Sequence, residues 1–399
     1  MKEEIKKNRR LMIYTFILTI VCTVSFCVLS LLTYIGVMFK DGSSFDVKGV
    51  DGLFERRAYV SSRVSGEITT ERLDQIIDIY HKYPSEEAFY RVNEQYPEIY
   101  LLLISAYSNP SDENDFLISQ LTSAEDFYDQ HKVKLQKVLE SGRKYELSSN
   151  EINYLMQGDI KGPFIYDFTD HWVLYKNAYL FIGFLLALIG IVFTTYIFSQ
   201  EKELEMDKVL GIFPNRIGVS LGKSKIGMCF TFVSINYFVS IFVAFIMLLL
   251  PFGETGWNAS IQTFFDYYTS CFQWNLTQYF WITLIAGWIV LMGVIGCAAL
   301  VTSILQSRMM ALIVNVVIAY IPILLSKMIY SSLLLHILEL HPLVNFNTDQ
   351  FIKSFYSYGA GIHRVTGYGL TTAIMMATIF LTIVFCPKSF GKRLQGRIK

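Results

Sequence analysis

Six long apolar blocks constrain this chain more than any other feature. They cover about residues 12–39, 176–198, 226–251, 279–304, 309–330 and 368–387. An apolar run of about 18 or more residues predicts a transmembrane helix. The first block far exceeds the ~7–15 apolar residues of a secretory signal, so we predict a retained anchor. With 53% hydrophobic residues, the chain is predicted to be an all-α polytopic membrane protein with six transmembrane helices.

Lys and Arg residues collect on alternate sides of these blocks. Residues 1–10, 199–225 and 388–399 each contain five of them, whereas residues 252–278 contain none. Basic residues stay on the cytoplasmic side of a membrane. We therefore predict a multi-pass membrane protein with both termini cytoplasmic. Its predicted cytoplasmic segments are the N-terminus 1–11, the loop 199–225 and the tail 388–399. Its predicted outer segments are 40–175, 252–278 and 331–367, the last of which is apolar enough to be re-entrant.

The outer segment 40–175 is predicted to be a small helical domain inserted between the first two spans. Residues 70–82 place Leu73, Ile76, Ile77 and Tyr80 at helical spacing, and residues 121–142 and 147–159 have similar patterns. Residues 41–175 contain 24 acidic and 13 basic residues, a net charge of about −11. An acidic surface attracts cations and cationic peptides, although simple solubility explains the same composition.

Two motif-like patterns do not support catalysis. Gly218, Gly222, Lys223 and Ser224 resemble the phosphate loop G-x-x-x-x-G-K-[ST], but only three residues separate the glycines. A turn at Pro214 precedes them and an apolar span follows, so the strand and helix of such a loop are missing. His336 and His341 are five residues apart, whereas a zinc-binding helical pair requires four. We therefore expect no metal site and no enzymatic activity in this chain.

The cytoplasmic loop does contain an amphipathic pattern. Met206, Val209, Leu210 and Phe213 fall on one helical face, and charged residues occupy the others. Residues 201–213 are therefore predicted to form a short helix beneath the bilayer. Such a helix is either a plain connector or a docking element for a soluble partner.

This arrangement resembles the permease subunits of type-2 ABC exporters, in particular a Gram-positive subset with a large extracellular domain between spans one and two. Their cytoplasmic coupling helix follows the pattern F-x-x-E-x-x-x-G-T…L-L…P-x-S-R…G-K. In the same order, this chain has Phe198, Glu201, Leu210, Pro214, Arg216, Gly222 and Lys223. It departs from the pattern where Glu205-Met206 replaces Gly-Thr. The motif covers about 30 residues, and the six-span topology covers the whole chain.

The resemblance implies that this chain is a permease in a bacterial cell membrane, with ATP and Mg bound by a separate ABC ATPase subunit. It also implies a second permease copy or a paralogue, contact with membrane lipids, and no nucleic acid. The residues that it implies for coupling to the ATPase are Glu201, Glu205, Lys208, Leu210, Phe213 and Arg216. Lys223 is expected to contact lipid phosphates or the partner.

The expected cargo is a peptide, such as a bacteriocin or antimicrobial peptide, or a lipid. Two alternatives stay open. One is an ABC-linked protein that transmits force, like the cell-division and macrolide-export permeases, whose outer domains mix strands and helices. The other is a peptide receptor or immunity protein that transports nothing and needs no docking helix.

Overall fold

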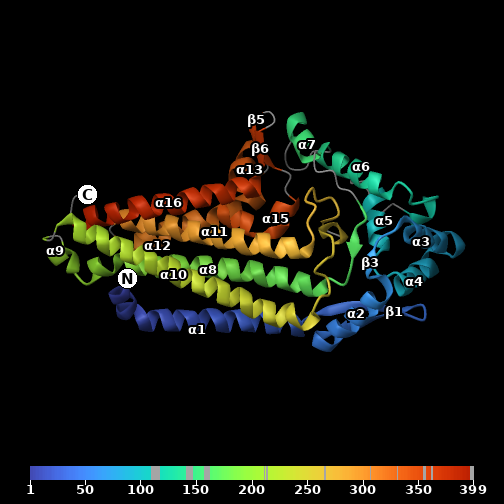
Figure 1. Cartoon of the computed structure of the whole chain (residues 1–399), viewed down its shortest axis with the longest axis horizontal. Coiled ribbons are helices and arrows are strands. Elements are labelled where there is room, and N and C mark those ends of the chain that lie inside the picture. Colours follow the sequence, from blue (N-terminus) through green and yellow to red (C-terminus); the bar gives the residue numbers. More distant parts are fainter. Residues whose placement is uncertain are drawn as a thin grey trace.

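The computed structural model describes residues 1–108, 117–140, 147–156, 162–210, 212, 214–264, 267–305, 307–329, 331–353, 356–360 and 363–395. The chain is mostly helical, and six of its helices are long and apolar enough to cross a membrane. They are α1 (Lys2–Leu32), α8 (Asp170–Glu203), α10 (Asn215–Leu248), α11 (Leu276–Ile304), α12 (Arg308–Met328) and α16 (Gly367–Leu394). They lie along one elongated bundle (Figure 1). These helices indicate a multi-pass membrane protein.

The centre of the bundle is formed by α8 and α11, which are the most deeply buried of the six. Two tyrosine hydroxyl groups are satisfied there by backbone carbonyls. Tyr179 donates to the Thr283 carbonyl at 2.8 Å, and Tyr237 donates to the Leu284 carbonyl at 2.9 Å. A Cβ on Gly287 would clash with both hydroxyl groups. A glycine at this position therefore lets the three helices approach closely enough to bury polar groups without leaving them unpaired.

A separate, mostly helical domain lies at one end of the bundle (Figure 1). Its helices are α2 (Gly49–Val64), α3 (Thr70–Lys82), α4 (Ser85–Gln95), α5 (Tyr100–Tyr107), α6 (Phe127–Glu140) and α7 (Ser149–Met156). The expected apolar stripe of α3 is buried at Leu73, Ile76 and Ile77. The Thr69 side chain caps this helix by accepting a hydrogen bond from the Arg72 amide.

Short antiparallel strand pairs, two of them within the helical domain, were not predicted. Strands β1 (Ile35–Lys40) and β2 (Ser43–Lys48) pair antiparallel, as do β3 (Gly66–Glu67) with β4 (Ile165–Tyr166), and β5 (Ser357–Ala360) with β6 (His363–Thr366). Asp41 and Gly42 join β1 to β2, and both have positive φ, 51° and 71°. Two positive φ values in a two-residue loop suit the twist of a β-hairpin, and Asp-Gly favours them. The apolar block 12–39 is therefore divided: its helix ends at Leu32, and residues 35–39 belong to a strand.

Between α12 and α16 the chain forms three short helices, α13 (Ser332–Glu339), α14 (Pro342–Phe346) and α15 (Thr348–Lys353). Helix α14 is buried against the bundle at Leu343, Val344 and Phe346. The Phe346 ring stacks on Tyr179 of α8 with centroids 4.9 Å apart. Burial of this kind is what a re-entrant segment requires. Short 3-10 helices occur at η2 (Ile118–Gln120), η3 (Leu250–Phe252) and η4 (Ile261–Thr263).

The N-terminus, the C-terminal part of α16 and the short helix α9 (Met206–Leu210) lie together at the end opposite the domain (Figure 1). We call this the α9 end, and the other the domain end. A cluster of charged residues lies at each end.

Candidate functional site

The loop at the α9 end is shorter and less helical than predicted. Helix α8 continues to Glu203, and a turn follows in which Glu205 has a positive φ of 54°. Helix α9 then spans only Met206–Leu210, and α10 already begins at Asn215 after Pro214. The predicted helix over 201–213 is therefore divided between the end of α8 and α9. Residues 215–225, predicted to belong to the loop, form the first turns of α10.

Apolar side chains are exposed around α9. They are Leu204, Met206, Val209, Ile212 and Ile217, which we call the α9 surface. Ile212 is 83% exposed, which is costly for an isoleucine that faces water. Leu210 points the other way and packs, half-buried, against the core of the bundle. The α9 surface lies among exposed charged residues such as Lys202 and Arg216, as expected of a helix that lies outside the apolar spans.

Glu201 does not belong to this surface. Its side chain is only 2% exposed, and Lys225 of α10, which is fully buried, lies 2.8 Å from its carboxylate. Lys7 of α1 lies 3.5 Å from the same carboxylate, and Glu4 lies 3.8 Å from the Lys225 ammonium group. Two carboxylates and two ammonium groups thus form one balanced cluster, the α9-end cluster. It ties α1, α8 and α10 together, and Glu201 is unavailable for direct contact with a partner.

The α9-end cluster is closed by further contacts. The Lys225 ammonium group also donates to the Ile197 carbonyl and lies 5.6 Å from the centre of the Phe390 ring. Beside it, Gln200 donates to Asn8 at 3.1 Å. Sequence reasoning counted Lys225 only as a loop cation, because the start of α10 was placed at 226.

The glycines of the apparent phosphate loop have a packing role. A Cβ on Gly218 would lie 2.9 Å from the Gly391 Cα, and a Cβ on Gly222 would lie 2.9 Å from the Pro387 Cα. Both contacts are with the backbone of α16, which cannot easily move aside. Small residues four positions apart let two helices cross closely. Gly218 and Gly222 therefore allow α10 to pack directly on α16.

The remaining predicted coupling residues are Glu205, Lys208, Phe213 and Arg216, together with Lys223. Glu205 and Arg216 are exposed at the α9 end, and so is Lys223 on α10. Lys208 belongs to α9, but its side chain lies outside the described part of the structure, as does Phe213. A role of any of these residues in coupling stays a prediction.

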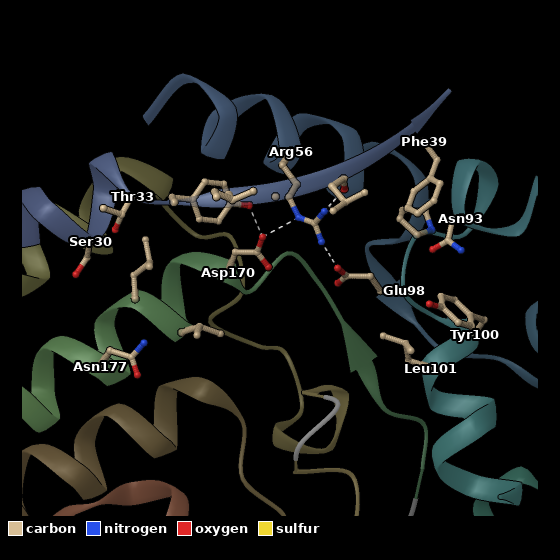
Figure 2. Close-up of a pocket in the computed structure, with 17 residues that line it drawn as sticks. Ser30, Thr33, Phe39, Arg56, Asn93, Glu98, Tyr100, Leu101, Asp170 and Asn177 are labelled. Carbon is tan, nitrogen blue, oxygen red and sulfur yellow. Dashed lines mark hydrogen bonds and ion pairs between the residues drawn. The ribbon is translucent and has the colours of Figure 1, made fainter. Parts of the chain in front are cut away.

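A second candidate site is a cavity at the domain end, with a volume of about 700 Å³. Figure 2 shows that its walls come from the end of α1, from β1 and α2, from the turn before α5, and from the start of α8. The cavity thus lies at the point where the domain joins two spanning helices.

Arg56 of α2 crosses this cavity and connects its walls (Figure 2). Its guanidinium group donates to Asp170 of α8 at 2.7 Å and also pairs with Glu98. The Val37 carbonyl of β1 accepts a further hydrogen bond from it. A Cβ on Gly36 would lie 2.6 Å from the Arg56 Cδ, so the glycine makes room for this side chain. We call Arg56, Glu98 and Asp170 the domain-end cluster.

Two tyrosines complete the domain-end cluster. The Tyr34 hydroxyl donates to Asp170, and the Tyr166 hydroxyl donates to Glu98 at 3.0 Å. Glu98 has a positive φ of 68°, an uncommon conformation that occurs here in the turn between α4 and α5. The Glu98 side chain keeps 36% of its surface exposed. Its partial burial and the neighbouring Asp170 carboxylate raise its pKa above the ordinary value, against the opposing effect of Arg56.

The domain-end cluster could not be found from sequence. Its members lie 42 and 114 residues apart in the chain, and each is an ordinary charged residue in a charged domain. Gly36 and the Asp41-Gly42 turn are the local signals of the hairpin that helps to bring them together.

No family model, curated protein or solved structure matches this chain.

Proposed function

We propose that this chain is the transmembrane permease subunit of an ATP-driven ABC exporter. The observation that carries the proposal is the α9 surface: an exposed apolar group at the end of a six-helix bundle, opposite the extra domain. Exposed apolar patches rimmed by charges are typical of protein interaction sites. In this proposal the α9 end is cytoplasmic and docks a soluble ATPase, which binds ATP and Mg.

The α9-end cluster supports a route for mechanical coupling. A push on α9 acts directly on α8 and α10, because α9 joins these two helices. Lys225 and Glu201 link the same two helices through a buried ion pair, and Glu4 and Lys7 connect α1 to it. A movement of the docked ATPase is thereby transmitted to three spans together rather than to one.

A second permease copy or a paralogue completes the proposed exporter. Helices α1, α12 and α16 have only 17%, 22% and 22% of their apolar windows buried within the chain. Their remaining apolar faces are available to lipids or to another permease. The proposed path for the cargo, a peptide or a lipid, runs between the two permeases.

Affinity purification of the tagged chain from its own membranes in mild detergent tests the docking step. We expect an ATPase with a phosphate-binding loop to co-purify with the natural sequence. Val209→Asp, which places a charge on the α9 surface, should reduce its recovery at least tenfold. Val50→Asp, the same change at an exposed position of the domain, should leave recovery unchanged. If no ATPase is recovered, or if both variants retain it equally, the proposal is wrong.

Force transmission without transport is the second candidate function. It is favoured by the domain-end cluster, because Arg56 and Asp170 connect the domain rigidly to α8. ATP-dependent movement of labelled peptide in proteoliposomes separates the two candidates, since a force transmitter would hydrolyse ATP without moving cargo.

A further inference from the structure

The charges that line the domain-end cavity do not balance. Arg56, Glu98 and Asp170 are the only charged residues among those that line it. One guanidinium group therefore faces two carboxylates, which leaves a formal charge of −1 when both are ionised. An uncompensated charge in a partly desolvated site is unfavourable and attracts a counter-charge.

The remaining walls combine polar and apolar groups. Phe39, Tyr100 and Leu101 of the domain contribute apolar and aromatic surface, and Val173 and Leu174 contribute more from α8. Ser30 and Thr33 contribute hydroxyl groups at the end of α1; each donates to a carbonyl of its own helix and can still accept hydrogen bonds. This lining suits a ligand with a cationic group on an apolar body. The volume of about 700 Å³ lies within the range of about 300–1,000 Å³ that is usual for ligand sites.

The position of the cavity supports entry from the membrane surface. Ser30 and Asn177 belong to the spanning helices α1 and α8 and Thr33 directly follows α1, whereas Arg56 and Glu98 belong to the domain (Figure 2). An amphipathic peptide at the interface would meet the cavity at the level where the spans end. Asn177 is exposed at the wall formed by α8.

We propose that this cavity binds a basic side chain of a cationic amphipathic peptide, whose ammonium or guanidinium group is received by Glu98 and Asp170. The proposal rests on the exporter function for its physiological meaning, because it names the class of cargo. Peptide binding itself does not depend on the ATPase.

The environment of Glu98 should make peptide binding depend on pH. Glu98 is faced by Arg56, Asp170, Tyr34, Tyr100 and Tyr166. Burial and Asp170 raise the pKa of Glu98, so ionisation of this carboxyl group is unfavourable. A bound cation makes the ionisation more favourable. The cation prefers ionised Glu98, so peptide binding should strengthen as the pH rises through the pKa of Glu98 and weaken as it falls.

The experiment uses the full chain in phosphatidylcholine nanodiscs without any ATPase. The probe is a fluorescent Leu-Lys-Leu-Lys-Leu peptide with an amidated C-terminus, measured by anisotropy against empty nanodiscs. Glu98→Gln removes the excess charge and keeps an oxygen for Arg56, and it should weaken binding about tenfold, or about 1.4 kcal/mol. Glu55→Gln is the matched control, since Glu55 is exposed on the same helix as Arg56 and does not line the cavity. It should bind like the natural sequence.

Two further measurements keep the test decisive if Glu98→Gln lowers stability. Asn177→Trp fills the cavity from an exposed position without removing a charge, and it should also weaken binding about tenfold. The same peptide with acetylated lysines should bind the natural sequence about tenfold more weakly. Equal binding of the two peptides, unchanged binding by both cavity variants, or no saturable binding to the natural sequence would overturn the proposal. Since no ATPase is present, such a failure leaves the docking of an ATPase at α9 unaffected.

Discussion

The two ends of the bundle each hold a charged cluster, but the clusters differ in burial, in balance and in access. At the α9 end, Glu4 and Glu201 are matched by Lys7 and Lys225, and Lys225 is completely buried. At the domain end, Arg56 alone faces Glu98 and Asp170 beside a cavity of about 700 Å³. A balanced, closed cluster holds helices together, whereas an unbalanced cluster beside a cavity is suited to receiving a charged ligand.

The largest effect is expected from removing the central cation at each end. Lys225→Met leaves the buried Glu201 without its closest partner, and breaking a buried pair in this way costs about 3–5 kcal/mol of unfolding free energy. Arg56→Met should cost less, about 1–3 kcal/mol, because water in the cavity can solvate Glu98 and Asp170. Thermal and denaturant unfolding of the two purified variants in detergent measure both losses of unfolding free energy. An equal loss at the two ends would remove the distinction between them.

A double variant sharpens this comparison. Lys225→Met combined with Glu201→Met removes both partners of the closest pair, so it should recover much of the stability that Lys225→Met loses. If the double variant lost as much unfolding free energy as the two single variants lose together, Glu201 and Lys225 would not form a coupled pair.

Acid should affect the domain end through His131. This side chain is buried, its Nε2 lies 2.6 Å from the Tyr268 carbonyl, and burial lowers its pKa from 6.5 to about 4. Between pH 6.5 and about 4, the unfolded chain therefore binds a proton at His131 and the folded chain does not. The stability contributed by neutral His131 is complete above pH 6.5 and is lost as the pH falls towards 4, by up to about 3 kcal/mol.

Unfolding of the natural sequence and of His131→Gln between pH 7.5 and 4.5 isolates this effect, because other titrating groups are shared. The variant should lose less stability on acidification. Parallel pH curves for the two proteins would show that His131 is not held neutral by the fold.

Smaller effects are expected where α10 crosses α16. Gly222→Ala places a Cβ 2.9 Å from the Pro387 Cα and should cost about 1–3 kcal/mol by overpacking. At Gly227, also on α10, a Cβ would meet only the flexible Met1 Sδ, at 3.4 Å. Gly227→Ala should therefore be neutral or stabilise by up to about 1 kcal/mol through helix propensity. Equal unfolding midpoints for the two variants would contradict the close crossing.

Sequence reasoning succeeded where a pattern repeats over many residues. Long apolar runs predicted the six spans, and the spacing of Leu73, Ile76 and Ile77 predicted α3. It was less successful for short local elements, since the apolar block 12–39 was read as one span but contains both the end of α1 at Leu32 and most of strand β1. It failed for contacts between distant residues. Glu201 was predicted to face a partner, but its carboxylate forms an ion pair with Lys225 inside the bundle. This contact depends on how α8 and α10 pack.

The central claim is that the two ends face opposite sides of the membrane, the α9 end towards a cytoplasmic ATPase and the domain end towards an external peptide. Labelling of single introduced cysteines in intact cells with a membrane-impermeant maleimide tests it directly. Ser43→Cys, in the exposed β1–β2 hairpin, should be labelled in intact cells, with the unmodified chain as the blank. Val209→Cys, in α9, should be labelled only after the membrane is permeabilised. Labelling of Val209→Cys in intact cells, with protection of Ser43→Cys, would contradict the claim, because a cytoplasmic ATPase could not then reach α9.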